Sequence, residues 1–331
     1  MDILNNQFIC YDNIRASVEI TDGDIETYGV SYGDVLFQRS SETLEDVGQA
    51  NVYLDSQPAV FGGFVIRGKS KGNYHPMFFR YLLASPTARK KIIVKGAGAQ
   101  HFNIGQDGLS TVYLNIPSIQ EQEKIAKLLE CIDTRITTQN KIIEKLESLI
   151  RGIYKTLLGE SDQYRYLDEL CEIKKGVQVN KEELSEKGLY YVMNGGITPS
   201  GYYDLYNTEA NTISISEGGN SCGYVQYNYT PFWSGGHCYT LENISNVVDN
   251  RYLFHYLKAN ELQIMSLRIG SGLPNIQKKD LSAFRIPLPA LNKQINIAKA
   301  LDTLLYKITV DKNIYSTYKQ QKEYLLQQMF I

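Results

Sequence analysis

The chain has 331 residues, and its 34 lysines and arginines nearly balance its 36 aspartates and glutamates. Its mean hydropathy is −0.29, and no apolar run approaches the roughly 18 residues that a membrane helix needs, which argues against a membrane protein. The N-terminus lacks the basic-then-apolar pattern of a secretory signal, so we expect a cytoplasmic protein. Five scattered cysteines without a C-x-x-C pair argue against structural zinc and against a disulfide framework.

The near-neutral total charge conceals segments of opposite charge. Residues 1–55 carry eleven acidic and two basic side chains, whereas residues 56–106 carry eight basic side chains and no acidic one. More weakly, residues 188–250 have no lysine or arginine, and residues 251–285 have six basic and two acidic side chains. Bases gathered in one stretch can neutralise phosphates locally whatever the total charge. The alternative is that they form the solvated faces of ordinary helices.

Residues 1–116 predict a globular module that ends in a short strand. A glycine-rich loop, Gly96–Asn103, follows the basic residues of this module. Its backbone N–H groups can hold a phosphate oxygen, or it is simply a tight turn between a helix and a strand. Val112, Leu114 and Ile116 then alternate with other residues and predict a strand that runs into Pro117.

Residues 117–160 predict one long helix. A proline just before a helix start is well tolerated, because its missing N–H would have no partner there. Beyond Pro117, apolar residues recur at alternating steps of four and three, which is the a/d pattern of a coiled coil, with Gln139 as a polar break. The seam residues are Ile125, Leu129, Ile132, Ile136, Ile143, Leu146 and Ile150.

Residues 161–288 predict a second module of mixed α and β structure. The runs Tyr190–Met193 and Thr212–Ser216 are separated by glycine pairs that mark turns. A helix from Arg251 to about Leu267 is expected next, then the glycine loop Gly270–Asn275 and a short strand before Pro289.

Residues 289–331 predict a second long helix with the same seam. Its apolar members are Ile297, Leu301, Leu304, Ile308 and Leu325, and its polar break Asp311 falls at the position of Gln139. Helices of this length would expose an apolar stripe if they were alone. We therefore predict that the two pack on each other as an antiparallel pair.

The second half of the chain repeats the first at an offset of 172 residues. Residues 116–127 match residues 288–299, and Asn103-Ile104 matches Asn275-Ile276. The chain is thus predicted to be a tandem duplication of a module followed by a long helix.

No catalytic motif is present in either copy. The P-loop, the G-x-G-x-x-G fingerprint, H-E-x-x-H, G-x-S-x-G and the zinc deaminase signature are all missing, as is an Asn-Pro-Pro-aromatic motif. The four histidines are dispersed along the chain. We therefore expect no catalytic site and no metal site in this chain.

A module followed by a P-x-x-x-E-Q-x-x-I-A-x-x-L helix, occurring twice, resembles the specificity subunit of Type I restriction-modification systems. Residues 167–176 also resemble that family's module opening, and residues 33–37 resemble an internal strand. The first module has no counterpart of residues 164–176, so we expect it to be N-terminally shortened. The motif residues are Pro117, Glu121, Gln122, Ile125, Ala126 and Leu129, then Pro289, Gln294, Ile297, Ala298 and Leu301.

The resemblance implies an α+β protein: a tandem repeat of two mixed α/β target recognition domains, each followed by a long helix, the two helices packing as an antiparallel coiled coil. The expected divisions are a first target recognition domain at 1–116, a spacer helix at 117–160, a second domain at 161–288 and a second spacer helix at 289–331. In that family each domain reads one half of a split site in double-stranded DNA.

The resemblance also implies partners. The spacer helices would hold two methyltransferase subunits, which would bind S-adenosylmethionine, and restriction subunits are further candidate partners. This chain would have no cofactor and no catalytic role. A scaffold or decoy that captures partner subunits, but reads DNA weakly or through one module only, is the alternative.

We expect phosphate contacts from basic side chains, and base reading from Asn, Gln, Arg and Tyr side chains in the module loops. Asn194 and Trp233 are equally compatible with a turn residue and a core residue. The candidates are Arg39, Arg67, Lys69, Lys71, Lys90, Lys91 and Lys95 in the first module, and Lys174, Lys175, Asn194, Asn220, Tyr224, Trp233 and Arg268 in the second.

Overall fold

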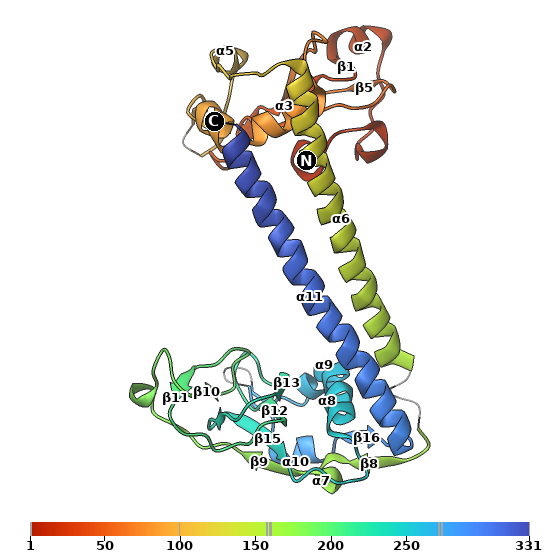
Figure 1. Cartoon of the computed structure of the whole chain (residues 1–331), viewed down its shortest axis with the longest axis vertical. Coiled ribbons are helices and arrows are strands. Elements are labelled where there is room, and N and C mark those ends of the chain that lie inside the picture. Colours follow the sequence, from red (N-terminus) through yellow and green to blue (C-terminus); the bar gives the residue numbers. More distant parts are fainter. Residues whose placement is uncertain are drawn as a thin grey trace. The chain divides into compact units, whose positions relative to one another are not determined.

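The computed structural model describes residues 2–98, 100–156, 158, 161–270, 272 and 274–330 (Figure 1). The chain divides into two compact units, of which the first comprises Met1–Lys141 with Lys312–Ile331 and the second Ile142–Asp311. None of the described helices is long and apolar enough to cross a membrane.

The first unit is built around a three-stranded antiparallel sheet in the order β4-β2-β6. Helix α3 packs on β4, and α4 follows it. The core between sheet and helices includes Val52, Phe78 and Ile92. The elements are α1 (Asp2–Asn5), η1 (Tyr11–Asn13), α2 (Asp22–Tyr28), β1 (Gly29–Val30), β2 (Val35–Gln38), β3 (Ser40–Ser41), β4 (Ala50–Val52), β5 (Ala59–Val60), β6 (Val65–Gly68), α3 (Pro76–Ala84), α4 (Pro86–Ile93), β7 (Phe102–Asn103), α5 (Gln106–Ser110) and the start of α6 (Ile119–Thr156).

The second unit has a four-stranded antiparallel sheet, β13-β12-β15-β9, a three-stranded sheet, β11-β10-β14, and the pair β16-β8. The strands predicted at Tyr190–Met193 and Thr212–Ser216 are confirmed as β10 and β12. The elements are β8 (Tyr164–Tyr166), α7 (Leu167–Leu170), β9 (Glu172–Lys175), η2 (Lys181–Glu183), β10 (Tyr190–Met193), β11 (Gly201–Tyr203), β12 (Thr212–Ser216), β13 (Val225–Asn228), β14 (Trp233–Ser234), β15 (Cys238–Glu242), α8 (Asn250–Ala259), α9 (Glu261–Ser266), α10 (Lys278–Ser282), β16 (Arg285–Pro287) and the start of α11 (Leu291–Met329).

Two local predictions were wrong. The single helix expected from Arg251 to about Leu267 is two helices, α8 and α9, because Asn260 leaves the helical conformation and its side-chain amide caps the Tyr256 carbonyl (2.8 Å). The strand expected at 112–116 is not formed, although its repeat, β16, is a strand. The two segments differ in whether a neighbouring strand is present. β16 pairs with β8, whereas no described segment of the first unit takes the place of β8.

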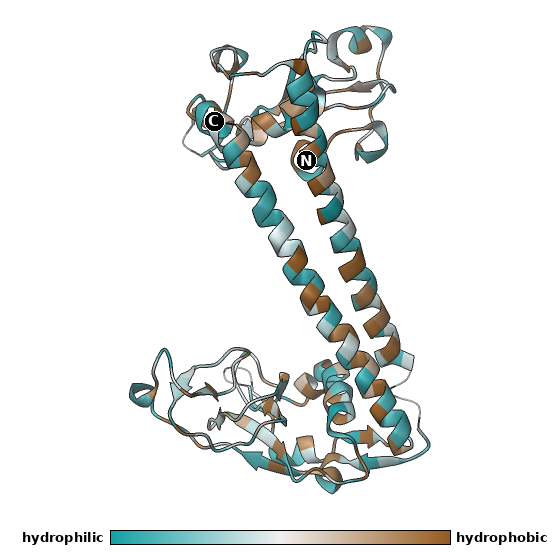
Figure 2. Cartoon of the chain, viewed as in Figure 1, coloured by the Kyte–Doolittle hydropathy of each residue, from teal (hydrophilic) through white to brown (hydrophobic). Residues whose placement is uncertain are grey.

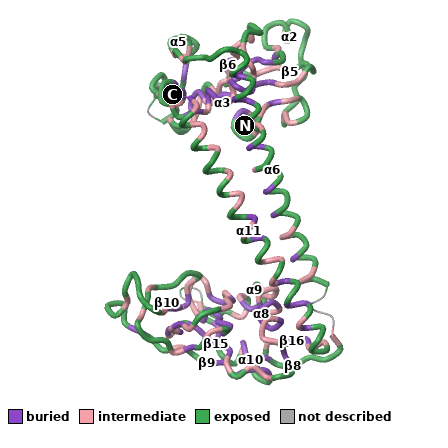
Figure 3. Tube along the Cα trace, viewed as in Figure 1, coloured by how far each residue is buried: buried purple, intermediate pink, exposed green. Residues whose placement is uncertain are grey.

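The two long helices pack against each other in antiparallel directions, as predicted. In the first unit, the start of α6 shares a hydrophobic cluster with the end of α11, and in the second unit the end of α6 shares one with the start of α11. Hydrophobic residues recur along both helices (Figure 2), and every seam residue is buried or half-buried (Figure 3). The Lys322 ammonium contacts the buried Asp133 carboxylate at 2.5 Å, which joins the helices within the first unit.

The ends of the seam also belong to the modules. Ile125 and Leu129 of α6 lie in the same cluster as Phe78 of α3, and Leu301 of α11 lies with Leu253 of α8. The heptad pattern predicted contacts between helices, but near each helix start the same positions fill the core of a module. Each long helix is therefore anchored in its module by apolar packing.

A buried glutamine near the start of each long helix makes a second connection to the module. The Gln122 Oε1 accepts from the His75 N–H (2.9 Å), and its Nε2 donates to the Pro117 carbonyl (2.9 Å). The Gln294 Oε1 accepts from the Asp249 N–H (2.9 Å), and its Nε2 donates to the carbonyls of Pro289 (2.8 Å) and Val247 (3.1 Å).

His75 and Asp249 are the N-caps of α3 and α8. The glutamine of the repeated motif therefore ties the first turn of the long helix to the start of the module's main helix, in both units.

A half-buried charged cluster, in which only His255 is fully buried, also joins α8 to α11 in the second unit. The Arg251 guanidinium and the His255 Nε2 (2.8 Å) both contact the Asp302 carboxylate, and Arg251 lies over the Tyr227 ring at 4.0 Å. Burial lowers the pKa of His255 despite its hydrogen bond to Asp302. Burial alone would raise the pKa of Asp302, but the hydrogen bonds from Arg251 and His255 lower it.

These pKa shifts predict two steps in the pH dependence of stability. Because the pKa of His255 is lower in the folded chain than its usual value of about 6.5, the unfolded chain binds the proton first, and stability falls as the pH drops below about 6.5. The contribution of Asp302 is lost only below about pH 4. Trp233, the one tryptophan of the chain, lies in the second unit and reports its unfolding in urea.

His255→Gln should flatten the decline in the urea midpoint between pH 7 and pH 5. The matched control is His237→Gln, since the His237 side chain is 64% exposed. An unchanged decline in the His255 variant would contradict the assignment.

Candidate nucleic-acid interface

Each unit carries a β-hairpin whose connecting loop closes on a glycine. The hairpin is β2–β4 in the first unit and β12–β13 in the second. The Gly48 N–H donates to the Gln38 carbonyl (2.9 Å), and the Gly223 N–H donates to the Ser216 carbonyl (2.8 Å). We call the connecting segments, residues 39–47 and 217–222, the hairpin loops. Their equivalence rests on this hydrogen-bond pattern, since their lengths and sequences differ.

A second loop in each unit is closed in the same way. Ala97 and Asn103 exchange two backbone hydrogen bonds (2.9 Å each), and Ile269 and Asn275 exchange two of 2.8 and 3.0 Å. The positions are 172 residues apart in the sequence. We call residues 98–102 and 270–274 the glycine loops; Ala99, Ser271 and Leu273 lie outside the described residues.

The two loops of a unit lie side by side. Ser40 pairs with Asn103 in the β3–β7 ladder, and Gly218 forms a bridge with Asn275. The residue after each asparagine adds one more bond between the loops. The Ile104 N–H donates to the Arg39 carbonyl (2.9 Å), and the Ile276 N–H donates to the Glu217 carbonyl (2.8 Å). We call each joined set the loop pair. Arg39 and Glu217 therefore occupy equivalent positions.

The first unit has free cations, of which two lie at its loop pair. Arg39 is exposed in the hairpin loop, and Lys95 is exposed before the glycine loop. Lys90 is exposed on α4. Lys69 and Lys71 are exposed after β6, at the opposite end of the β2–β6 ladder from the hairpin loop, because Gly68 pairs with Val35 at the start of β2. Within the described residues, none of these five side chains has a hydrogen-bond or ion-pair partner. They are available to phosphate oxygens.

The other two candidates of the first unit are engaged inside it. The Arg67 guanidinium donates to the Gly29 carbonyl and lies 5.3 Å from the centre of the Phe61 ring. The Lys91 ammonium donates to the Tyr113 carbonyl (3.0 Å). These side chains hold the module together in the structure.

In the second unit both lysines of β9 are paired with glutamates. Lys175 contacts Glu217 Oε1 at 2.6 Å, and Lys174 contacts Glu242 at 3.4 Å. The Tyr239 hydroxyl also donates to Glu217 Oε1 (3.1 Å). Burial, and then the Glu217 charge, raises the pKa of Tyr239 to about 12, so the hydroxyl keeps its proton.

Three further candidates of the second unit have structural contacts. The Asn194 Oδ1 accepts from the His237 N–H (3.1 Å), and the Trp233 Nε1 donates to the Val177 carbonyl (2.7 Å). Tyr224 is half-buried, with the Lys258 ammonium 4.0 Å from its ring centre.

Asn220 and Arg268 remain exposed, and neither has a side-chain partner among the described residues. Asn220 lies in the hairpin loop, and Arg268 lies just before the glycine loop, as Lys95 does in the first unit.

Sequence reasoning did not select Asn103 or Asn275, which join the loops of each pair. The signal for them was present, because Asn103-Ile104 and Asn275-Ile276 were already matched in the repeat. In the part of the chain that the structure describes, no three His, Cys, Asp or Glu side chains group as metal ligands.

Comparison with known proteins identifies the family. Residues 3–148 and 161–319 match the family described as the Type I restriction modification DNA specificity domain. The chain belongs to this family. The two matched stretches each hold one module and most of one long helix, so the tandem repeat is confirmed as two specificity domains.

Proteins described as type I specificity subunits are similar to this chain over different lengths. A type I specificity subunit of Mycoplasma pneumoniae is 38% identical over 144 residues, which are 43% of this chain and 38% of that protein. One of Mycoplasma genitalium is 36% identical and is covered over 36% of its length. The chain therefore aligns with less than two fifths of these two relatives. A type I restriction enzyme MjaX specificity subunit of Methanocaldococcus jannaschii is 26% identical over 86% of this chain and 75% of that protein.

A solved specificity subunit shares the fold. The crystal structure of the Type I restriction-modification S subunit from M. genitalium has a TM-score of 0.67 with this chain, at 19% identity, and covers 92% of this chain and 85% of that one. The α+β class, with two mixed modules and two long antiparallel helices, is thereby confirmed.

Proposed function

We propose that this chain is the DNA sequence-recognition subunit of a Type I restriction-modification system and directs methyltransferase subunits to a bipartite site in double-stranded DNA. One observation carries the proposal: the same loop pair is built twice on one chain, with different side chains at equivalent positions. Arg39 in the first unit is exposed and free, whereas Glu217 in the second is buried and neutralised by Lys175.

The difference between the loop pairs suits two different half-sites. An exposed guanidinium is the commonest reader of guanine in the major groove, and a free asparagine such as Asn220 suits adenine. Lys69, Lys71, Lys90, Lys95 and Arg268 would contact phosphates, which position the modules without reading sequence. In this proposal the helix pair, with 38 and 39 residues per helix, sets the spacing between the half-sites.

The proposal assigns the chemistry to partners. The methyltransferase subunits, two per chain, would bind S-adenosylmethionine and transfer the methyl group, restriction subunits would be able to join, and this chain would have no catalytic role. The assembly would act in the cytoplasm, where the host DNA lies.

The deciding experiment is methylation mapping. Host genomes with and without this gene are sequenced for methylated adenine, and the proposal expects one bipartite motif that disappears with the gene. A scaffold or decoy that only captures partner subunits would leave the methylation pattern unchanged or without sequence preference. That result would reject the proposal. The family match, which extends across both modules, favours DNA recognition over the scaffold.

Removing charge from the first loop pair should weaken DNA binding by the assembled methyltransferase complex. For Arg39→Ala we expect about a tenfold loss on the proper site and relaxed preference at one base pair. For Lys95→Ala we expect a loss that is uniform across sequences and a slope of log K against log salt that is smaller by about 0.9. Fluorescence anisotropy over a salt series measures both.

Lys127→Ala is the matched control, because Lys127 is an exposed cation on α6, outside the loop pairs. Equal losses of DNA affinity in all three variants would show that the loop pair is not part of the DNA interface.

A further inference from the structure

Each unit has a turn with two glycines just before the strand that pairs with the first strand of its hairpin. The segments Gly62–Val65 and Gly235–Cys238 each have two glycines, then a residue with an aromatic ring, then a small apolar residue. In each segment the carbonyl of the first glycine accepts from the N–H of the fourth residue, at 3.0 Å in both. The turns lead into β6 and β15, which pair with β2 and β12 in the same antiparallel way. We call these equivalent segments the Gly-Gly turns.

Each Gly-Gly turn is joined to the loop pair of its unit. The Arg39 N–H donates to the Phe64 carbonyl (2.9 Å), and the Glu217 N–H donates to the His237 carbonyl (2.9 Å). These bonds extend the β2–β6 and β12–β15 ladders by one residue, so Arg39 lies opposite Phe64 and Glu217 lies opposite His237. Opposite residues of an antiparallel ladder have their side chains on the same face. In the second unit, His237 Nδ1 accordingly lies 4.0 Å from Glu217 Oε2.

The third residue of each turn exposes an aromatic ring. Phe64 is 77% exposed, and the His237 side chain is 64% exposed. Within the described residues, the Phe64 ring contacts no other aromatic ring and no cation. An apolar ring is stabilised when a ligand removes it from water, and a ligand that covers Phe64 also meets the free guanidinium of Arg39. Double-stranded DNA satisfies both side chains, because its major groove offers guanine acceptors beside thymine methyl groups.

The backbone of the second Gly-Gly turn is held by the neighbouring strand. The Asn194 Oδ1 accepts from the His237 N–H (3.1 Å), and the Gly235 N–H donates to the Met193 carbonyl (2.8 Å). A Cβ on Gly235 would lie 2.6 Å from the Asn194 Oδ1, so this close approach requires glycine. Asn194 therefore fixes the position from which the His237 ring projects.

We propose that Phe64 and His237 contact bases, each in the half-site that its own unit reads. The inference rests on the proposed function and assigns two further residues to the same DNA surface. Phe64 contacts the methyl group of a thymine next to the base that Arg39 reads, because that methyl is the apolar group of the major groove. His237 donates from Nε2 to the N7 of a purine, while its Nδ1 lies on the side of Glu217.

Thymine analogues test Phe64 in the assembled methyltransferase complex. The probe is a duplex with the bipartite site found by methylation mapping, in which each thymine of the first half-site is replaced in turn by deoxyuridine. Deoxyuridine lacks only the methyl group. One replacement should weaken binding of the unaltered complex about fourfold, which is the effect of one buried methyl group. The same replacement should not weaken binding of Phe64→Ala further, and this variant should methylate sites that differ at that base pair.

Purine analogues test His237 in the same assay. Each purine of the second half-site is replaced in turn by its 7-deaza analogue, in which a C–H group takes the place of N7. One replacement should weaken binding of the unaltered complex about fivefold, as expected for one hydrogen bond. His237→Ala should lose this sensitivity and keep the sensitivity of the first half-site to deoxyuridine.

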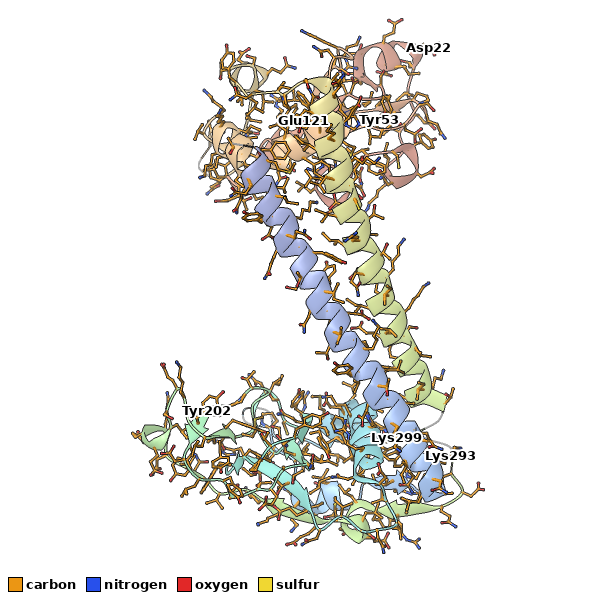
Figure 4. All side chains as sticks on the ribbon, in the orientation of Figure 1. Asp22, Tyr53, Glu121, Tyr202, Lys293 and Lys299 are labelled. Carbon is orange, nitrogen blue, oxygen red and sulfur yellow. The ribbon has the colours of Figure 1, made fainter. Side chains whose placement is uncertain are left out.

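The matched controls are exposed tyrosines at the opposite ends of the same ladders. Tyr32 is 62% exposed and precedes Gly33, whose N–H donates to the carbonyl of Tyr53 (2.8 Å; Tyr53 is labelled in Figure 4). Tyr229 is 66% exposed and follows β13, whose last residue pairs with the first residue of β12. Tyr32→Ala and Tyr229→Ala should leave the methylated motif and both sensitivities unchanged.

The inference is overturned if Phe64→Ala and His237→Ala keep the sensitivities of the unaltered complex while Arg39→Ala still relaxes the motif. A first half-site without any A·T pair would overturn the assignment of Phe64 as well. Absence of a bipartite motif from the methylation map is a different result, because it rejects the proposed function and the inference with it.

Discussion

Replacement of Gln294 by alanine should lower the free energy of unfolding of the second unit by about 3 kcal/mol. The side chain is 1% exposed and makes three hydrogen bonds to backbone groups. Alanine leaves the Asp249 N–H and the Pro289 and Val247 carbonyls without these partners, and a buried polar group left unsatisfied costs about 1–3 kcal/mol. Urea unfolding followed by the fluorescence of Trp233 measures the change.

Two further substitutions separate hydrogen bonding from packing. Gln294→Glu keeps an acceptor for the Asp249 N–H but faces the two carbonyls with an oxygen, so it should be at least as damaging as alanine. Asn296→Ala, at an exposed position of the same helix turn, should change the midpoint little. A small loss in both Gln294 variants would show that the connection is dispensable.

The second large effect is expected at Gly223. Its φ of +91° is rarely adopted by residues with a side chain, and a Cβ there would lie 2.8 Å from the Cα of Met265 and 2.9 Å from its nitrogen. Backbone strain of about 1–2 kcal/mol and overpacking of about 1–3 kcal/mol should together destabilise Gly223→Ala by about 3–4 kcal/mol. The measurement is again urea unfolding monitored at Trp233.

Gly219→Ala is the matched control. Gly219 has a similar φ of +79°, but no atom lies within 4 Å of the Cβ position. It should therefore cost only the backbone strain, about 1–2 kcal/mol. Equal losses in the two variants would mean that the close approach of Gly223 to Met265 of α9 contributes nothing to the loss.

The repeat and the long helices could be predicted because their signals are periodic. A seam that steps by four and three residues reflects burial along one face of a helix, and the two prolines mark where each helix begins. The spacing of the apolar residues does not show which part of the molecule covers the seam. We therefore did not predict that Ile125 and Leu301 pack into the cores of the modules. The prediction of a strand at 112–116 was wrong for a related reason. A strand needs a neighbouring strand to pair with, and the local alternation of apolar and polar residues does not show whether one is present.

The repeat indicated the equivalence of the glycine loops, but the hairpin loops could not be matched from the sequence. The equivalence of the hairpin loops is defined by backbone hydrogen bonds, and they differ in length and in charge. Arg39 could be proposed as a free cation, but nothing in the sequence shows that Glu217 holds the same place or that it occupies Lys175. Charge counts likewise cannot distinguish Lys95, which is free, from Lys91, which holds the Tyr113 carbonyl.

The glutamine connections bear on which positions of a module can change. Gln122 and Gln294 bond only to main-chain groups, which every residue offers whatever its side chain, apart from the proline nitrogen. At the bonded positions the module can therefore change its side chains and keep these hydrogen bonds. The apolar packing at the helix starts and the contacts of Arg251 and His255 with Asp302 do depend on side chains, so those are the positions where the join constrains the sequence of the module.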